Sequence, residues 1–347
     1  MAVYRFETIT PAEAANYNAG ADTLQFQTAT ASGAQVIAAY LGGPPAQVGI
    51  TFNGQTVTFG TGVYGDLDIT FPDGSTLFVG GLDADSIAGT GLGDGLFGGQ
   101  GADTLNGGDG GDLLQGNQGA DSLAGGLGDD SIHGGQDSDV ITLGGAASTA
   151  SERNWTNGNR GDDVIDGTPG ADTILGGQGT DLLRGGDGAD WMFGNLGDDD
   201  VHADGGDDLI FGEGGADTLA GGTGADTFVF RTGASDAAVG LLDRVTDWSA
   251  FDRIDAGVSP LGYAEIGPIT MPGYGGYGGP TYSPTDYNTM LGRTNELMAT
   301  SPATDIVAAQ VDFDVVVFVD SNADNVADLA IVLVGANLTD VDFTSFV

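Results

Sequence analysis

The chain lacks several residue types that most proteins of its length contain. Its 347 residues include no cysteine and no lysine, and only two histidines. The absence of cysteine excludes disulfide bonds and thiolate metal sites. The formal net charge of −42 makes nucleic acid and anionic membranes unfavourable partners.

Long apolar runs are also missing. Nowhere do 18 apolar residues follow one another, so we expect no membrane insertion. Residues 1–7 lack the charged segment and apolar run that mark a cleavable signal peptide. On these facts alone, the sequence predicts a cytoplasmic protein.

Aspartate and glycine are present in excess. Of the 50 acidic residues, 44 are Asp, and 64 residues are Gly. Glu on helices would serve solvation equally well, so a surplus of the shorter carboxylate indicates ligands held at defined turns. Because 40% of the residues are hydrophobic and the apolar ones recur in register, the glycine content does not indicate disorder.

Residues 80–229 repeat nine residues at a time. The first unbroken copy, residues 98–106, reads Gly-Gly-Gln-Gly-Ala-Asp-Thr-Leu-Asn. Each copy has two glycines, a variable residue, a glycine, a variable residue and an aspartate, with an apolar residue two positions further on. The sixth-position aspartates form two series with a spacing of nine: Asp85, Asp94, Asp103, Asp112, Asp121, Asp130 and Asp139, then Asp163, Asp172, Asp181, Asp190, Asp199, Asp208, Asp217 and Asp226.

This unit predicts a coil with a metal-binding turn. The glycines allow a tight turn with carbonyls facing inward, and the last three residues form a short strand whose apolar side chain enters a core. Two units make one 18-residue coil, so alternate aspartates stack on the same side. Carboxylates and carbonyls are hard oxygen ligands that select Ca²⁺ over Zn²⁺ or copper, and their loose geometry suits Ca²⁺ better than Mg²⁺. We expect a ceiling on the order of 11 ions from the number of gaps between stacked turns.

The repeat resembles the RTX (repeats-in-toxin) family, whose members form a parallel β-roll. The resemblance implies an all-β fold: a β-roll in two arrays flanked by small β-rich N-terminal and C-terminal domains. Some copies depart from the pattern, and their sites are expected to be weaker or distorted. The fourth-position glycine is replaced by Asp83 and Asp137, the second-position glycine by Thr90, Asn117, Asn159, Thr168, Asn195 and Glu213, and one copy starts with Ala203-Asp204.

The spacing divides the chain into five parts. Residues 1–79 form a small β-rich module with one short helix, which Thr10-Pro11-Ala12-Glu13 begins as a capping box. Asn53-Gly54 predicts a β-hairpin, and Pro72-Asp73-Gly74 predicts a second one. Residues 80–142 form the first array, 143–157 an insert loop, 158–230 the second array, and 231–347 a β-rich cap with a Tyr/Gly-rich surface loop at 271–289.

The C-terminal part has a further resemblance. Residues 224–230, 243–248 and 252–255 resemble the segment after the roll in serralysin-type proteins, and residues 320–328 resemble their acidic turn. In that family the C-terminal region carries an uncleaved type I secretion signal. The resemblance therefore implies the type I secretion machinery as a partner and a secreted, extracellular or cell-surface location, in place of the cytoplasmic one.

We expect no enzyme and no catalytic residue. Serralysins have a zinc protease with His-Glu-x-x-His, but His133 and His202 both stand at the ninth repeat position, where an exposed strand residue is expected. The 79 N-terminal residues are few for a catalytic domain. An enzyme with an unrecognised site is the least expected alternative.

The combination of a small cap, a long roll and a C-terminal β domain resembles S-layer or matrix-type RTX proteins of alphaproteobacteria. It implies a homo-oligomer or polymer that folds and assembles with calcium. Residues 273–282 and the insert with Trp155 are candidate subunit contacts, or simply a surface loop and a packed side chain. The alternative is a monomeric calcium-dependent adhesin or carrier, with a cell-surface polysaccharide as a possible ligand.

Overall fold

A computed structural model describes residues 2–18, 21–28, 31–41, 47–60, 63–65, 69, 71–231, 242–256, 263–269, 291, 294–295, 298–299, 306–311, 314–320, 326–341 and 346. The chain divides into two compact units, Met1–Gln178 and Gly179–Val347. The Tyr/Gly-rich segment expected as a surface loop, 271–289, lies outside the described residues.

The first unit begins with a small module of mixed structure. Thr10 caps its helix α1, and Thr10 and Glu13 exchange hydrogen bonds as the sequence predicts, although the helix has only five residues. Asn53 and Gly54, both with positive φ, form the predicted hairpin turn between β4 and β5. The elements are β1 (Val3–Arg5), α1 (Pro11–Ala15), β2 (Thr23–Gln25), the 3₁₀ helix η1 (Gly33–Gln35), β3 (Ile37–Leu41), β4 (Gln47–Phe52) and β5 (Gln55–Phe59).

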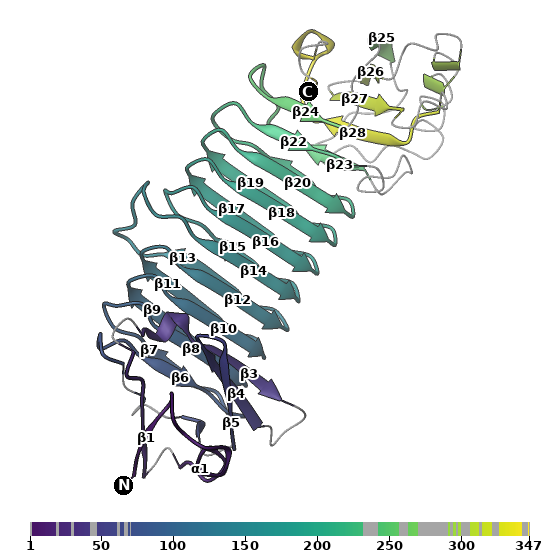
Figure 1. Cartoon of the computed structure of the whole chain (residues 1–347). Coiled ribbons are helices and arrows are strands. Elements are labelled where there is room, and N and C mark those ends of the chain that lie inside the picture. The colour runs from purple at the N-terminus through teal and green to yellow at the C-terminus, as the bar shows by residue number, and fades with distance from the viewer. Residues whose placement is uncertain are drawn as a thin grey trace. The chain divides into compact units, whose positions relative to one another are not determined.

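The repeats of the first unit form a parallel β-solenoid, in which successive strands alternate between two sheets (Figure 1). One sheet holds β6 (Leu77–Val79), β8 (Gly95–Gln100), β10 (Leu113–Gln118), β12 (Ser131–Gln136), β14 (Trp155–Arg160) and β16 (Thr173–Gln178). The other holds β7 (Ser86–Ala88), β9 (Thr104–Asp109), β11 (Ser122–Leu127), β13 (Val140–Gly144) and β15 (Val164–Asp166). The predicted all-β, β-roll class is thus confirmed.

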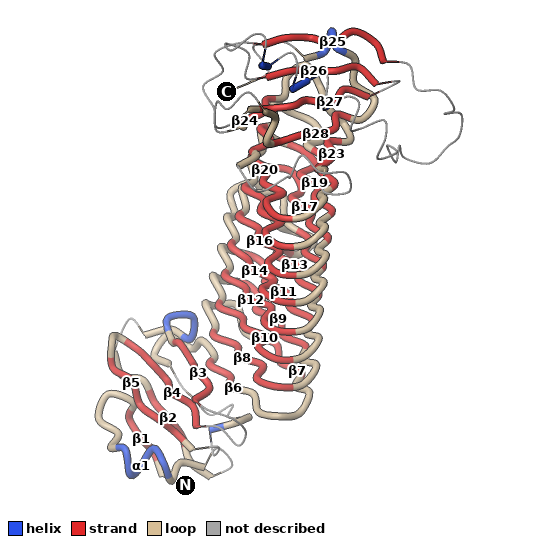
Figure 2. The backbone as a smooth tube through the Cα atoms, turned by 90° about the vertical axis from the view of Figure 1, so that its right-hand side faces the viewer, coloured by secondary structure: helices blue, strands red, loops and turns tan. Residues whose placement is uncertain are grey.

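The second unit contains the same two kinds of strand. One sheet holds β18 (Trp191–Leu196), β20 (Leu209–Gly214), β22 (Thr227–Val229) and β24 (Arg253–Asp255). The other holds β17 (Leu182–Asp187), β19 (Asp200–Gly205), β21 (Thr218–Ala220) and β23 (Asp243–Val245), followed by β28 (Leu329–Leu333), β27 (Asp314–Val319), β26 (Ile306–Val311) and β25 (Tyr263–Ile269). A 3₁₀ helix, η3 (Leu338–Asp340), follows β28. Figure 2 shows how short turns join the strands.

The repeat pattern produces this fold through strand alternation. In β12, Ile132 and Gly134 face the interior, whereas Ser131 and His133 face outward. Every apolar residue two positions after a repeat aspartate from Leu96 to Phe228 is buried. A one-residue slip would expose this whole row, so the register is fixed by the core.

The N-terminal module shares its core with the first coils of the roll. Leu77, Val79 and Phe97 belong to the same buried cluster as Phe6 and Phe59. At the predicted second hairpin the amide of Gly74 donates to the carbonyl of Phe71 (3.2 Å), so a turn is present. Residues 67, 68 and 70 of the expected first strand lie outside the described residues, and β6 pairs in parallel with β8. The hydrophobic run of β6 is used to start the roll.

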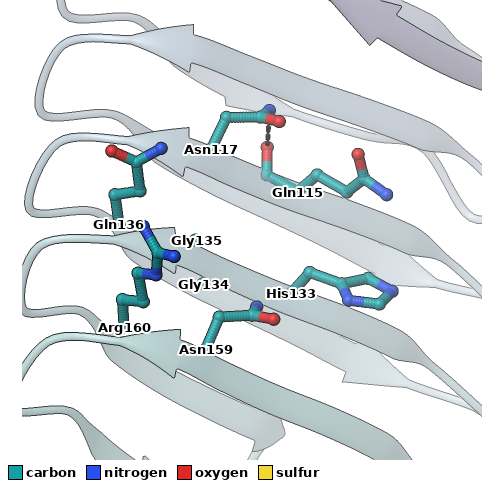
Figure 3. Close-up of a pocket in the computed structure, with 8 residues that line it drawn as sticks. All are labelled: Gln115, Asn117, His133, Gly134, Gly135, Gln136, Asn159 and Arg160. Carbon is teal, nitrogen blue, oxygen red and sulfur yellow. Dashed lines mark hydrogen bonds between the residues drawn. The ribbon is translucent and has the colours of Figure 1, made fainter. Parts of the chain in front are cut away.

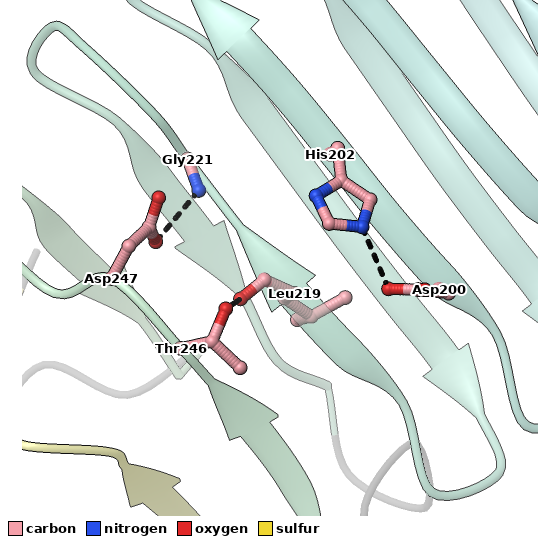
Figure 4. Close-up of polar contacts among 6 residues, drawn as sticks. All are labelled: Asp200, His202, Leu219, Gly221, Thr246 and Asp247. Atoms are coloured by element: carbon pink, nitrogen blue, oxygen red, sulfur yellow. Dashed lines mark hydrogen bonds and ion pairs between the residues drawn. The ribbon is translucent and has the colours of Figure 1, made fainter.

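At the other end, two strands continue the sheets past Phe230. β23 pairs in parallel with β21, and β24 with β22. The hydroxyl of Thr246 donates to the carbonyl of Leu219 (3.2 Å), and the amide of Gly221 donates to Asp247 (3.0 Å; Figure 4). A separate apolar cluster around Phe318 and Val332 fills the C-terminal region.

One core position carries a hydroxyl. Thr156 of β14 takes the place of the apolar residue, is fully buried, and its hydroxyl has no hydrogen-bond partner among the described residues. An unsatisfied buried hydroxyl costs about 1–3 kcal/mol, so Thr156→Val should stabilise the calcium-loaded protein by about 1 kcal/mol in denaturant unfolding. Thr104→Val, at an exposed strand position, is the control and should change stability by less than about 0.5 kcal/mol. A destabilised Thr156→Val variant would contradict this assignment.

Candidate calcium sites in the turns

The structure places the predicted aspartates in rows along the turns. All of them except Asp85, which is half-buried, are at most 3% exposed. Within each unit, aspartates 18 residues apart lie one above the other and are joined by hydrogen bonds. The amide of Asp103, for example, donates to Oδ1 of Asp121 (2.7 Å), and the amide of Asp199 donates to Oδ1 of Asp217 (2.9 Å).

The second carboxylate oxygen lacks such a partner in many turns. No hydrogen bond reaches the buried Oδ2 atom at a set of nine positions among the described residues: Asp103, Asp112, Asp121, Asp130, Asp139, Asp199, Asp208, Asp217 and Asp226. A buried, unpaired carboxylate oxygen is too costly to persist without a compensating cation or proton. These oxygens fit the calcium sites that the sequence predicts.

The first glycine of many repeats allows the repeat aspartate to approach the backbone closely. A Cβ atom on Gly116 would lie 2.2 Å from Oδ2 of Asp121 and 2.6 Å from the carbonyl oxygen of Gly134. For Gly98 the corresponding distances are 2.2 Å to Asp103 and 2.9 Å to the carbonyl of Gly116. A Cβ atom at these distances would clash, so glycine at this position lets a carboxylate and a carbonyl from the next coil come together, and both are oxygen ligands that Ca²⁺ accepts.

Backbone carbonyls must complete the ligand set. No group of three or more His, Cys, Asp or Glu side chains comes together within the described ranges. This is expected for a coil that contributes one aspartate per turn, since carbonyls supply much of the coordination that Ca²⁺ accepts.

Burial raises the pKa of several aspartates in these rows. The pKa of Asp139 rises to about 8, first because burial removes water and then because Asp163 and Asp121 are like charges. Burial, with like charges adding to it, raises the pKa of Asp112, Asp121, Asp199 and Asp208 to about 7. At these positions burial therefore favours a protonated or cation-bound carboxylate over a free charge near neutral pH.

The structure adds three residues to these rows that the sequence analysis missed. Asn154 accepts from the amide of Asp130 (2.9 Å). Asp243 and Asp252 accept from the amides of Asp217 (3.0 Å) and Asp226 (3.2 Å). Asp243 and Asp252 are themselves nine residues apart, each with an apolar residue two positions later, and this signal could have identified them.

The two histidines lie on outward-facing strand positions. His202 of β19 is 3.0 Å from Asp200 (Figure 4). His133 of β12 packs against Trp155, with ring centroids 4.9 Å apart, and burial lowers its pKa. It borders an open groove of about 360 Å³ on the outer face of β10, β12 and β14 (Figure 3). The groove is lined by Gln115, Asn117, His133, Gly134, Gly135, Gln136, Asn159 and Arg160, so it presents amide, imidazole and guanidinium groups and no carboxylate.

The chain thus contains a parallel β-solenoid with buried aspartates stacked in most of its turns. A family model described as the RTX calcium-binding nonapeptide repeat matches residues 115–149, 157–192 and 193–228. The matched segments thus carry RTX calcium-binding nonapeptide repeats, and the β-solenoid that they form fits an RTX β-roll. Comparison with curated proteins gives no match. In the described residues no helix is long and apolar enough to span a membrane.

A side chain added at a first-position glycine should disrupt the calcium site at the neighbouring aspartate. Gly116→Ala places a methyl group against Asp121 and the carbonyl of Gly134, and the φ of Gly116 needs no glycine. We expect calorimetric titration to show at least one fewer calcium ion and a loss of about 1–3 kcal/mol in stability from overpacking. Gln115→Ala, at the neighbouring outward position, should retain the full number. An unchanged calcium number in Gly116→Ala would contradict the placement of the ion.

The raised pKa values also predict opposite effects of pH on the metal-free and loaded chains. Because folding raises the pKa of these aspartates above their usual 3.8 to between about 6 and 8, the folded chain binds protons more tightly than the unfolded one. In chelator, the folded roll should lose stability as pH rises from about 4 to about 8, and regain it on acidification. Calcium affinity should instead fall on acidification through that range. Circular dichroism against pH, with chelator and with calcium, measures both effects; a metal-free roll equally stable at pH 5 and pH 8 would contradict this prediction.

Proposed function

We propose that this protein is an extracellular, calcium-dependent structural protein that folds on Ca²⁺ after export and self-assembles at the cell surface or in a matrix. The unpaired buried Oδ2 atoms along the aspartate rows are the observation that supports this proposal most strongly. Calcium is scarce inside cells and abundant outside, and the free energy of metal binding becomes folding free energy when the site does not exist in the unfolded chain. The chain then stays open until it is exported, through a type I channel, to where calcium is present.

An exposed apolar patch supports self-assembly. On the outer face of β18 and β20, Phe193 and Phe211 stack with centroids 4.5 Å apart. Trp191 is 56% exposed and Leu196 is 59% exposed on the same strand. Aromatic and apolar side chains that gather on one flat face favour contact with another copy of the chain, and calcium reduces the net charge that opposes such contact.

The patch and the calcium requirement can be separated by experiment. Wild-type protein refolded with calcium should form ordered lattices, sheets or filaments in electron micrographs, whereas protein in chelator should remain dispersed and unfolded. Trp191→Ser should abolish or strongly reduce assembly and leave the calcium-induced change in circular dichroism intact. His202→Ser, at an outward position of the other sheet, is the control and should assemble as the wild type does.

Monodisperse wild-type particles that are fully folded in calcium would contradict self-assembly. The alternative function, a monomeric adhesin, is favoured by the groove in Figure 3, because its amide and guanidinium groups suit the hydroxyls of a polysaccharide. We propose no catalytic role under either function. Retention of the folded monomer on a polysaccharide matrix, lost in Arg160→Ala, would favour the adhesin.

A further inference from the structure

The repeat turns are of two kinds, which the residue four positions before the aspartate distinguishes. In most turns this residue has a positive φ, as for Gly99 (103°), Asn117 (79°) and Glu213 (69°). Thr90 and Thr168 occupy the same position and do not have a positive φ; Gly81, before the half-buried Asp85, also lacks one. A β-branched residue strongly disfavours the left-handed region, so each threonine gives its turn another backbone path.

That path directs two donors at the carboxylate. Oδ2 of Asp172 accepts from the amide (2.9 Å) and from the hydroxyl (2.8 Å) of Thr168. Oδ2 of Asp94 likewise accepts from the amide (2.5 Å) and from the hydroxyl (3.0 Å) of Thr90. Oδ2 is the oxygen left without a hydrogen bond in turns such as that of Asp121, where Asn117 keeps the positive φ.

The coil before Asp172 supplies further hydrogen bonds to its carboxylate. Its row position holds Asn154, a neutral residue, in place of an aspartate. Oδ1 of Asp172 accepts from the amide (2.8 Å) and from the side-chain Nδ2 (3.1 Å) of Asn154. The buried carboxylate of Asp172 therefore accepts four hydrogen bonds, and one of the two negative charges that a calcium ion would compensate is absent.

We propose that the turns of Thr90–Asp94 and Thr168–Asp172, the latter together with Asn154, bind no calcium and are closed by the protein's own hydrogen bonds. To coordinate a cation, Oδ2 would have to release two donors that already compensate its charge. The calcium-binding turns of Asp112 and Asp130 then lie between two metal-free turns of the same row. The inference rests on the proposed calcium loading of the other turns and specifies which turns it excludes.

Calcium stoichiometry of the full chain, measured by native mass spectrometry and by equilibrium dialysis, tests the proposal. The double variant Thr168→Gly, Asn154→Asp gives the turn of Asp172 the regular repeat pattern. It should bind one more ion, because it restores both the glycine and the second carboxylate. Asn159→Gly is the matched control: Asn159 already has a positive φ of 77°, so the number of ions should not change. An unchanged number in the double variant would overturn the proposal.

A second pair of variants tests the wild-type turn directly. Asp172→Asn should leave the number of bound ions unchanged, whereas Asp130→Asn, in the same row, should remove at least one. Equal losses in the two variants would overturn the proposal and leave calcium binding by the other turns intact. A wild-type chain that binds no calcium at all would instead refute the proposed function.

Discussion

The stacking of buried carboxylates is the constraint on which the roll depends. Each coil places one aspartate directly above another, with a single backbone amide donated to Oδ1, as between Asp112 and Asp130 (2.9 Å). The other carboxylate oxygen lies close to glycine backbone, as that of Asp112 does at Gly107. Burial is the main cause of the raised pKa of Asp112 and Asp208, and neighbouring carboxylates raise it further. Without cations or protons the rows repel, so the apolar core alone must hold coils that bury only one apolar side chain per nine residues.

The nine-residue period was sufficient to predict the fold and most of the rows, because strand alternation and turn length leave one register. The stacking of the sixth-position aspartates in successive turns follows from this period alone. The capping box at Thr10 and the turn at Asn53 were equally readable, since each depends on neighbouring residues. The parallel pairing of β6 with β8 could not be predicted, because the turn signal before β6 does not identify a partner strand further along the chain.

The nine-residue period did not predict the row residues of coils that contain insertions, for a geometric reason. Row partners are 18 residues apart in regular coils, but 24 apart from Asp130 to Asn154 and 26 apart from Asp217 to Asp243. Extra residues leave the coil as a loop while the row continues, so counting by nines loses the register. In the coil after the first insertion, Asn154 stands in place of the repeat aspartate and Thr156 in place of the apolar residue. Neither matches the repeat, so the sequence pattern does not identify this coil.

Departures from the repeat are therefore not equivalent. Asn117, Asn159, Asn195 and Glu213 replace glycine and keep its positive φ, whereas Thr90 and Thr168 do not. Asparagine tolerates the left-handed region and threonine does not, so each of these threonines directs both its amide and its hydroxyl to the carboxylate. A turn with asparagine or glutamate at the second position can thus keep the backbone path of a regular repeat. A turn with threonine there takes another path, and its hydroxyl donates to the carboxylate that would bind a cation. In such a roll the second repeat position, as much as the aspartate itself, decides where the negative charge is neutralised by metal and where by hydrogen bonds.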